Sequence, residues 1–356
     1  MRAGVLISIH ESHASVLGEF SGWRVPIVYL GTKAEHASVR NSCGLFDVSH
    51  MTRLVIEGER AADELSKLLT VDTRVMKVNR MKYSLILNER GGIIDDVTVS
   101  RLGPHRYLLV SNAVTRDRVI DWIGSNVIID DLTHDSLMLA VQGPSSPNVI
   151  REVLGVKTDS MRWFQLNLSE YRGCECVVSR SGYTGEDGFE VILIKPAIDA
   201  ATGLWKSFVE RGATPCGLAV RDVLRLEAGY PLYGVDVDES MNPYEARLDS
   251  ALEMDRHDFI GRGALIGEKR IRVTLVGLMM SESGIPRRGM GVYRGEDKIG
   301  VVTSGCLSYS LQRGIALSHV SPDEVGDGRL VSIDYRGRRR SASIKLTPFV
   351  ERRMPR

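Results

Sequence analysis

Three strand-like runs follow one another closely between residues 82 and 112. They read KYSLILN, IIDDVTVSRL and HRYLLVSN, and a turn at residues 89–92 separates the first two. Short apolar runs bounded by turn residues predict hairpins. Successive hairpins form an antiparallel meander, whereas neighbouring strands of a doubly wound sheet are joined through helices. The pattern therefore favours antiparallel sheet and argues against a doubly wound fold.

The predicted secondary structure changes after about residue 271. The segments IRVTLVGLMM, GVYRGEDKIGVVTSG, GIALSHV and RLVSIDYRGRRRSASIKL are typical of strands and turns. Earlier segments mix strand patterns, near 137–142, 174–180 and 189–194, with helical patterns at 32–42, 59–70, 197–211 and 216–228. The sequence therefore predicts an α+β fold with a separate all-β domain at its C-terminal end.

Charge and hydropathy narrow the possible partners. The 356 residues include 46 basic and 45 acidic side chains, so the chain lacks the positive field on which non-specific nucleic-acid binding depends. No window approaches the roughly 18 apolar residues of a membrane helix, and the N-terminal apolar run is too short for a signal peptide. Five scattered cysteines indicate reduced thiols. We expect a cytoplasmic protein with a small-molecule or protein partner, and no nucleic acid or membrane.

Two adjacent acids, Asp95 and Asp96, interrupt the apolar pattern of the second run. Asp is depleted in strands, and a buried carboxylate is costly unless it is paired or functional. Strict alternation assigns two faces, with Ile93, Asp95, Val97 and Val99 on one and Ile94, Asp96, Thr98 and Ser100 on the other. One of the acids is therefore either an edge residue in water or a functional acid. Alternation alone selects Asp95, because it is the one among apolar neighbours.

The sequence contains none of the common nucleotide, zinc or serine-hydrolase motifs. A C-x-C pair at Cys174 and Cys176 lacks the further ligands of a closed metal site. The segment NSCGLFDVSHM holds Cys43, Asp47 and His50 but spans a helix-to-strand turn with no fourth ligand in view. We therefore predict no metal, and we interpret Asp47 as a turn residue that satisfies its own backbone.

Two further segments leave alternatives open. The glycine-rich segment SGYTGEDGFE, residues 181–190, carries acidic side chains that would repel phosphate. It either binds a ligand that donates hydrogen bonds or forms only a sharp surface turn. The helix at 216–228 ends at Gly229 and places Arg221 and Arg225 one turn apart. These arginines either face something acidic or pair with nearby acids and water.

Seven segments, in order, resemble the aminomethyltransferase (T-protein) family of the glycine cleavage system and its folate-dependent relatives. They are GEFSGWRVPIVY (18–29), VRNSCGLFDVSHM (39–51), GGIIDDVTV (91–99), VQGPSSP (141–147), SRSGYTGEDGFE (179–190), GLAVRDVLRLEAGYPLYGVDVDESMNPYEARL (217–248) and GVVTSG (300–305). The resemblance implies a three-domain cloverleaf of antiparallel and mixed sheets around a central folate site. The implied domains are a discontinuous α+β domain (1–50 plus 137–270), a second α+β domain with the meander (51–136), and a C-terminal β-barrel or jelly-roll-like domain (271–356).

The resemblance also implies a reaction. An aminomethyl-derived one-carbon unit passes from the S-aminomethyldihydrolipoyl arm of the H-protein to tetrahydrofolate, which releases ammonia and forms 5,10-methylenetetrahydrofolate. Tetrahydrofolate is the co-substrate, the lipoylated H-protein is the partner, and no metal is involved.

Individual residues of this sequence fall on the family's site. Asp96 matches the essential aspartate, which bonds the bridging amine of the folate, whereas alternation selects Asp95. The two agree if Asp96 lines the ligand cavity and Asp95 is held by backbone N–H groups at the start of the strand. Glu190 matches the carboxylate that accepts two donors from the pteridine edge, and Arg221 matches an arginine near the ring. Five more residues match flanking or pocket-lining positions: Tyr83, Tyr183, Met51, Val110 and Asn112.

Other readings of the resemblance exist. One is a folate-dependent methyltransferase or demethylase that acts on another small substrate, and another is a non-catalytic folate-binding factor for iron-sulfur assembly. That factor carries a K-G-C-Y-x-G-Q-E loop where this chain has SRSGYTGEDGFE. The chain also departs from the family at Tyr309, which follows Ser308 in place of proline, and at Met354, near a ligand-contacting tyrosine of some members. The basic YRGRRRSASIK, residues 335–345, either faces an acidic carrier or folate tail or forms a solvated hairpin.

Overall fold

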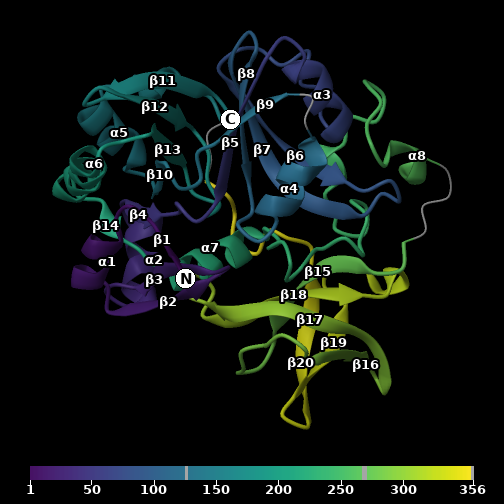
Figure 1. Cartoon of the computed structure of the whole chain (residues 1–356). Coiled ribbons are helices and arrows are strands. Elements are labelled where there is room, and N and C mark those ends of the chain that lie inside the picture. The colour runs from purple at the N-terminus through teal and green to yellow at the C-terminus, as the bar shows by residue number, and fades with distance from the viewer. Residues whose placement is uncertain (125–126, 267–270, 354–356) are drawn as a thin grey trace.

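The computed structural model describes residues 1–124, 127–266 and 271–353, so the predicted difference at Met354 lies outside the described residues. Figure 1 shows three lobes, with α7 (Leu218–Ala228) near the place where they meet. The prediction of an α+β fold with an all-β C-terminal lobe is confirmed. The domain boundaries stay a prediction.

The first lobe contains a mixed sheet whose strands come from distant parts of the sequence. Its order is β11 (Leu166–Tyr171), β12 (Cys174–Ser179), β13 (Gly188–Ile194), β10 (Ser136–Gln142), β4 (Gly44–Asp47) and β14 (Thr214–Pro215). Because β4 pairs with β10, the chain leaves this lobe after β4 and returns to it after about ninety residues. Helices α2 (Thr32–Asn41), α5 (Ser146–Leu154) and α6 (Ile198–Glu210) belong to the same lobe. Their apolar residues complete its core.

A small sheet and a short helix, which the sequence did not predict, precede this lobe. The sheet has the order β1 (Arg2–Ala3), β3 (Trp23–Val28) and β2 (Val16–Phe20). Helix α1 (Ile7–His13) contributes the buried His10.

The second lobe contains the predicted meander. Strands β6 (Arg80–Leu87), β7 (Ile93–Gly103) and β8 (Arg106–Ser111) pair in sequence order and antiparallel, followed by β5 (Thr52–Glu57) and β9 (Ile128–Asp131). Helices α3 (Ala61–Leu68) and α4 (Arg116–Ile123) cover its apolar core. Hairpin connections therefore formed where the turn residues predicted them.

A bulge near the start of β7 changes which side chains share a face. Ile86 pairs with Asp95 and Leu87 pairs with Ile93, so Ile94 is the extra residue. Ile94 consequently packs in the core of the second lobe, whereas Ile93 packs with Leu87 in the cluster that reaches α7 and the barrel. Strict alternation was therefore wrong for Ile93 and Ile94, because it allows for no inserted residue.

The third lobe is a closed antiparallel barrel. Its strand order is β15 (Thr274–Met280), β18 (Arg313–Val320), β17 (Asp297–Ser308), β16 (Gly291–Arg294), β19 (Leu330–Tyr335) and β20 (Arg338–Lys345). Closure leaves no free sheet edge. Between α7 and β15 the described residues, 229–266 and 271–273, include a 3₁₀ turn at Asp249–Ala251 and α8 (Arg262–Leu265) and are otherwise irregular.

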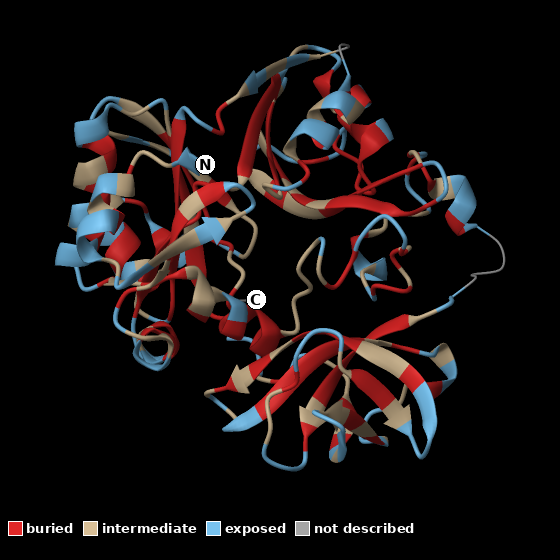
Figure 2. Cartoon of the chain, turned by 60° about the horizontal axis from the view of Figure 1, so that its bottom comes forward, coloured by how far each residue is buried: buried red, intermediate tan, exposed pale blue. Residues whose placement is uncertain are grey.

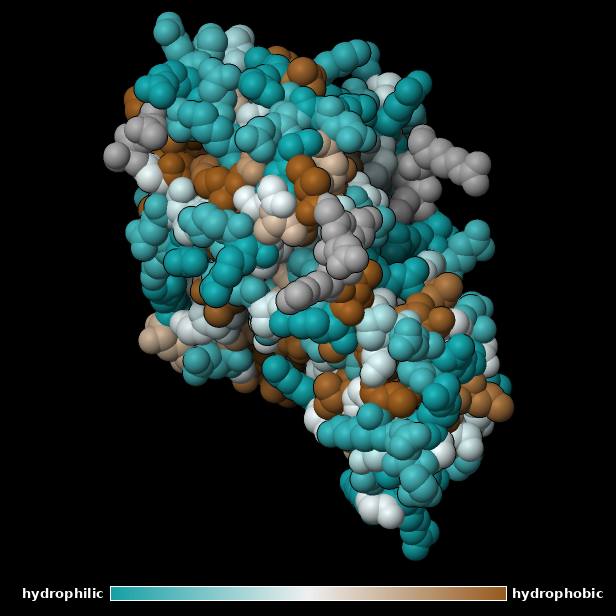
Figure 3. Space-filling view, turned by 90° about the vertical axis from the view of Figure 1, so that its right-hand side faces the viewer, coloured by the Kyte–Doolittle hydropathy of each residue, from teal (hydrophilic) through white to brown (hydrophobic). Residues whose placement is uncertain are grey.

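Helix α7 joins the lobes through two apolar faces. Val220 and Leu224 pack in a cluster shared by the first and second lobes, whereas Val223 and Leu226 pack with residues of the second lobe and the barrel. Buried strands recur in all three lobes, and the helices of the first two lobes expose one face to solvent (Figure 2). Hydrophilic residues dominate the face in Figure 3, with smaller hydrophobic groups among them. None of the helices in the described part of the chain is long and apolar enough to cross a membrane.

Candidate functional site

The two adjacent carboxylates on β7 occupy different environments. Asp95 is completely buried, whereas Asp96 remains partly exposed. Asp96 pairs across the ladder with Leu85 of β6, two residues from Tyr83, so these side chains share one face of the sheet. The Tyr83 hydroxyl donates to Asp96 Oδ2 at 3.1 Å. Of the pair, Asp96 is therefore the carboxylate that a ligand can reach.

Asp95 is fully supplied with hydrogen-bond donors. The Thr115 hydroxyl donates to its Oδ2 at 2.6 Å, and Asn112 donates from its backbone N–H and from Nδ2. The prediction that Asp95 is satisfied by hydrogen bonds is confirmed. The donors were predicted at the start of the strand, which is wrong, because they lie beyond β8, 17 and 20 residues further along the chain.

The Asn112 side chain links the two acids. Its Nδ2 lies 2.7 Å from Asp95 Oδ1 and 2.9 Å from Asp96 Oδ1. Burial raises the pKa of both carboxyls, and the neighbouring charge of Asp96 further raises the pKa of Asp95, to about 7. A carboxylate pair with raised pKa values can accept a proton near neutral pH.

Two tyrosines lie near Asp96. Burial and then the charge of Asp96 raise the pKa of the Tyr83 hydroxyl well above its usual value. Burial also raises the pKa of Tyr183, and the charge of Asp96 contributes to that rise. Tyr183 belongs to the glycine-rich segment and donates its hydroxyl hydrogen to the Pro231 carbonyl. The structure therefore brings both predicted aromatic residues within electrostatic reach of the same carboxylate.

Glu190 and Arg221 approach this region from the first lobe and from α7. Ser181 donates to Glu190 Oε2 at 2.7 Å. The Arg221 guanidinium lies 5.1 Å from the centre of the Tyr183 ring, on its face. Burial lowers the pKa of Arg221, and the charge of Glu190 opposes this shift. Arg221 thus interacts with Glu190 at a distance, and no ion pair joins them among the described residues.

Arg221 Nη1 is buried and has no hydrogen-bond partner within the described ranges. A buried guanidinium N–H without an acceptor is costly, which marks this atom as one that a ligand or water would satisfy. Arg225, one turn further on, is different: it makes ion pairs with Asp236 at 2.6 Å and with Asp222 at 2.8 Å. The two arginines that the sequence left undecided therefore have separate roles.

The remaining predicted residues line the same part of the sheet. Val110 on β8 pairs with Thr98 of β7, which pairs with Tyr83 of β6, so these three side chains form one cross-strand row. Met51 packs at the edge of the core cluster that contains Val110. All the predicted site residues thus gather where the second lobe meets α7 and the first lobe.

The segment with Cys43, Asp47 and His50 has a structural role that the sequence revealed only in part. Asp47 Oδ1 accepts the Ser49 N–H at 2.8 Å, which confirms the predicted turn. Its Oδ2 lies 2.7 Å from His10 Nε2, and this contact was missed because His10 is 37 residues away. Among the residues described, no group of three or more His, Cys, Asp or Glu side chains could hold a metal.

Two features had no signal in the sequence. Thr115 supports Asp95 from a loop without a recognisable motif. A cavity of about 470 Å³ lies beside the turn that precedes β7, and its lining residues include none of those predicted for the site: Asn88, Arg90, Gly92, Glu239, Ser240, Met241, Asn242, Tyr244, Ala264, Leu265 and Arg272.

Comparisons with known proteins cover nearly the whole chain. The family model described as the GCVT N-terminal domain matches residues 6–256, and the glycine cleavage T-protein C-terminal barrel domain matches residues 274–351. An aminomethyltransferase of Halothermothrix orenii is 37% identical over 98% of this chain and 100% of its own length. One from Aquifex aeolicus is 36% identical, with 97% and 95% covered. The crystal structure of glycine cleavage system aminomethyltransferase T from Bartonella henselae superposes with a TM-score of 0.93 at 33% identity, covering 100% of this chain and 99% of that one.

Proposed function

The chain belongs to the aminomethyltransferase family of the glycine cleavage system, and we propose that Asp96 is the general base of its reaction. The reaction is a tetrahydrofolate-dependent one-carbon transfer in glycine degradation. The aminomethyl-derived carbon moves to tetrahydrofolate, ammonia leaves, and 5,10-methylenetetrahydrofolate forms. We propose the lipoylated H-protein as the donor, and the cytoplasm as the location.

Binding of the pterin end requires acceptors for its paired donors. Glu190 offers a carboxylate whose orientation Ser181 fixes, and a carboxylate accepts an amino group and an adjacent ring N–H in bidentate fashion. Arg221 lies beside Tyr183, and an acceptor on the ligand would give its buried Nη1 the partner that it lacks among the described residues. Tyr83 and Tyr183 supply aromatic faces for the ring.

Asp96 is proposed to act on the bridging amine of the folate. As this nitrogen attacks the aminomethyl carbon, its proton passes to Asp96, and the carbon–sulfur bond breaks so that the lipoyl sulfur leaves. Ring closure by the second folate nitrogen then expels ammonia, which carries away the proton that this nitrogen loses, and the proton held by Asp96 passes to the lipoyl thiolate. Tyr83 and Asn112 hold the two oxygens of Asp96, so the carboxylate needs little reorientation before the transfer.

One observation supports this assignment most directly. Asp96 is the partly exposed member of a carboxylate pair with raised pKa values, and it lies within electrostatic reach of both tyrosines. Asp95, by contrast, is enclosed and held by three donors.

Asp96→Asn tests the proposal, with tetrahydrofolate and aminomethyl-loaded H-protein supplied and ammonia and methylenetetrahydrofolate followed. We expect folate binding to remain, and turnover to fall by about 10² to 10⁴, the usual contribution of a general base. Asp130→Asn is a matched control, because it removes an exposed carboxylate of the same lobe whose one ion pair within the described residues is with Lys195. Full activity of Asp96→Asn would remove the proposed base. A wild type that binds folate but shows no turnover with this donor would favour a family member acting on another small substrate.

A further inference from the structure

The C-terminal tail crosses from the barrel to the glycine-rich loop of the first lobe. After β20, the N–H groups of Phe349 and Val350 both donate to the Glu227 carbonyl of α7 at 3.0 Å. The Arg353 N–H then donates to the Gly185 carbonyl at 2.8 Å, and Arg353 forms a parallel bridge with Glu186. The tail therefore lies directly on the segment that contains Tyr183.

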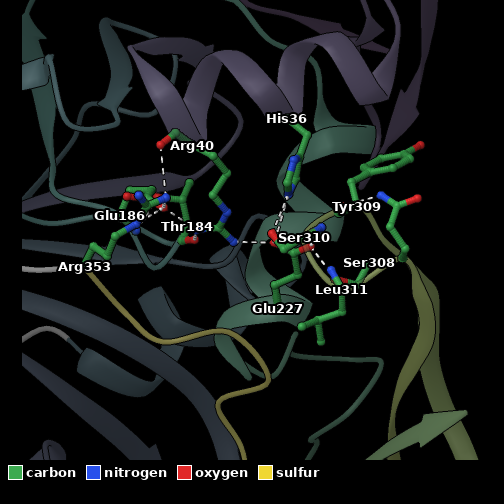
Figure 4. Close-up of polar contacts among 11 residues, drawn as sticks. His36, Arg40, Thr184, Glu186, Glu227, Ser308, Tyr309, Ser310, Leu311 and Arg353 are labelled. Atoms are coloured by element: carbon green, nitrogen blue, oxygen red, sulfur yellow. Dashed lines mark hydrogen bonds and ion pairs between the residues drawn. The ribbon is translucent and has the colours of Figure 1, made fainter. Parts of the chain in front are cut away.

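A buried carboxylate joins the tail to α2. Glu186 is almost completely buried, and its Oε1 receives Arg353 Nη2 at 2.6 Å and Arg40 Nη1 at 2.7 Å. Arg40 Nη1 also donates to the Thr184 carbonyl at 3.1 Å, and Arg353 Nη2 donates to the Arg40 carbonyl at 3.0 Å. Figure 4 shows the two arginines on either side of the loop. Arginines from both α2 and the C-terminal tail therefore bond to the loop.

Arg40 is itself anchored by a second buried carboxylate. Its Nη2 lies 2.5 Å from Glu227 Oε2, and the same oxygen lies 2.9 Å from His36 Nε2. The Ser308 hydroxyl of the barrel donates to Glu227 Oε1 at 2.6 Å. Although burial alone would raise the pKa of Glu227, the His36 hydrogen bond and the Arg40 charge lower it to about 2. Glu227 therefore stays ionised and fixes the guanidinium that holds the loop.

A second set of contacts connects the tail to the same loop through Arg352 and two stacked tyrosine rings. Arg352 donates to the Ala228 carbonyl at 2.8 Å and lies over the Tyr230 ring at 4.5 Å. Tyr230 stacks on Tyr183 with ring centroids 5.5 Å apart. Gly185 packs closely against the end of α7. Its φ is +78°, and a Cβ at this position would lie 2.9 Å from Ala228 Cβ, so a larger residue would not fit.

We propose that Arg353, Glu186 and Arg40 form a clamp that holds the loop of residues 182–188 in the conformation that presents Tyr183 to the folate. The clamp residues are positioning residues, since no role in contacting the ligand is assigned to them. This inference rests on the proposed function, because it takes Tyr183 as part of the folate site. A loop with glycine at positions 182, 185 and 188 is costly to order, so a clamp formed before binding improves affinity.

Arg353→Ala is the most direct test. The Arg353 side chain is 54% exposed, so its truncation leaves the protein core intact. We expect faster hydrogen–deuterium exchange in residues 182–188 and about a fivefold increase in the Kd and KM for tetrahydrofolate, with most of the effect in KM and not in kcat. Arg353→Lys retains the charge and should recover a large part of the affinity.

Arg329→Ala is the matched control. Arg329 also pairs a partly exposed guanidinium with a buried carboxylate, Glu324, at 2.9 Å, but within the barrel. It should change neither loop exchange nor folate affinity. Unchanged loop exchange in Arg353→Ala would overturn the clamp by itself, and so would an unchanged Kd if the wild type binds folate. If the wild type bound no folate, the proposed function would fail, and loop exchange would still test the clamp.

Discussion

Replacing Tyr83 with Phe removes one hydroxyl from the candidate site and keeps the aromatic ring. That hydroxyl donates to Asp96 Oδ2 at 3.1 Å and lowers the pKa of Asp96 against the larger raising effect of burial. A hydrogen bond to a charged group contributes about 1.5–3 kcal/mol. Because 3.1 Å is long for a charge-assisted bond, we use the lower end, which corresponds to about a tenfold change in the ionisation equilibrium.

The sign of the effect follows from the proposed role of Asp96 as a base. A base acts only when it is ionised, and the pKa of Asp96 already lies above its ordinary value. Loss of the donor raises this pKa further, so the acid limb of the kcat/KM profile moves to higher pH in Tyr83→Phe. Well below the limb, kcat/KM should fall about tenfold. Well above it, Asp96 is ionised in both proteins and the difference should vanish.

The assay is kcat/KM for tetrahydrofolate with loaded H-protein, measured across the acid limb. Tyr107→Phe is a matched control, because Tyr107 is a buried tyrosine of the same sheet whose hydroxyl donates to the Thr73 carbonyl at 3.4 Å and to no carboxylate in the described part of the chain. An acid limb at the same pH in Tyr83→Phe and wild type would refute the reasoning. A loss of equal size at every pH would also refute it, because the hydroxyl would then act without changing the ionisation of Asp96.

Two more predictions concern arginines. Arg221→Gln should weaken folate binding about tenfold with little change in stability, whereas Arg225→Gln should lower the free energy of unfolding by about 3–5 kcal/mol, since it leaves a buried Asp236 unpaired. Calorimetric titration and denaturant melts would contradict this if the two variants behaved alike. Reversal of the charges at Arg338–Arg340 should raise the KM for the H-protein at low salt and not at high salt, because exposed charges are screened. An unchanged KM at low salt would rule out docking at this hairpin.

The fold was predictable wherever the signal was local. Alternating runs and short turns are enough to specify the meander and to separate the barrel from the rest of the chain. The bulge at Ile94 was not predictable, because an inserted residue is defined by the partner strand and not by its own sequence. The same limit applies to the sheet of the first lobe, in which β4 and β10 pair across about ninety residues.

In the candidate site, too, some residues could be predicted from the sequence and others could not. Family segments assigned Asp96, Glu190 and Arg221 to it, but from residue types alone Arg221 and Arg225 were equivalent. One difference between them is Asp236, which the chain beyond α7 brings to Arg225. Thr115 likewise acts on Asp95 through tertiary contact. Such partners cannot be read from one sequence, since nothing in their own neighbourhood marks them.

The pairing of Asp95 with Asp96 has a consequence for the charge of the site. Asp95 accepts three hydrogen bonds, which favour its ionised form, while burial and the charge of Asp96 oppose ionisation and raise its pKa to about 7. In the proposed step Asp96 takes a proton from the folate amine, so that opposing charge disappears, and the three donors then favour an ionised Asp95. The pair therefore retains about one negative charge after the transfer. Since Asn112 donates to both acids, it keeps one oxygen of each in place before and after the proton moves. By like-charge repulsion, an ionised Asp95 would favour proton uptake by Asp96 without touching the substrate.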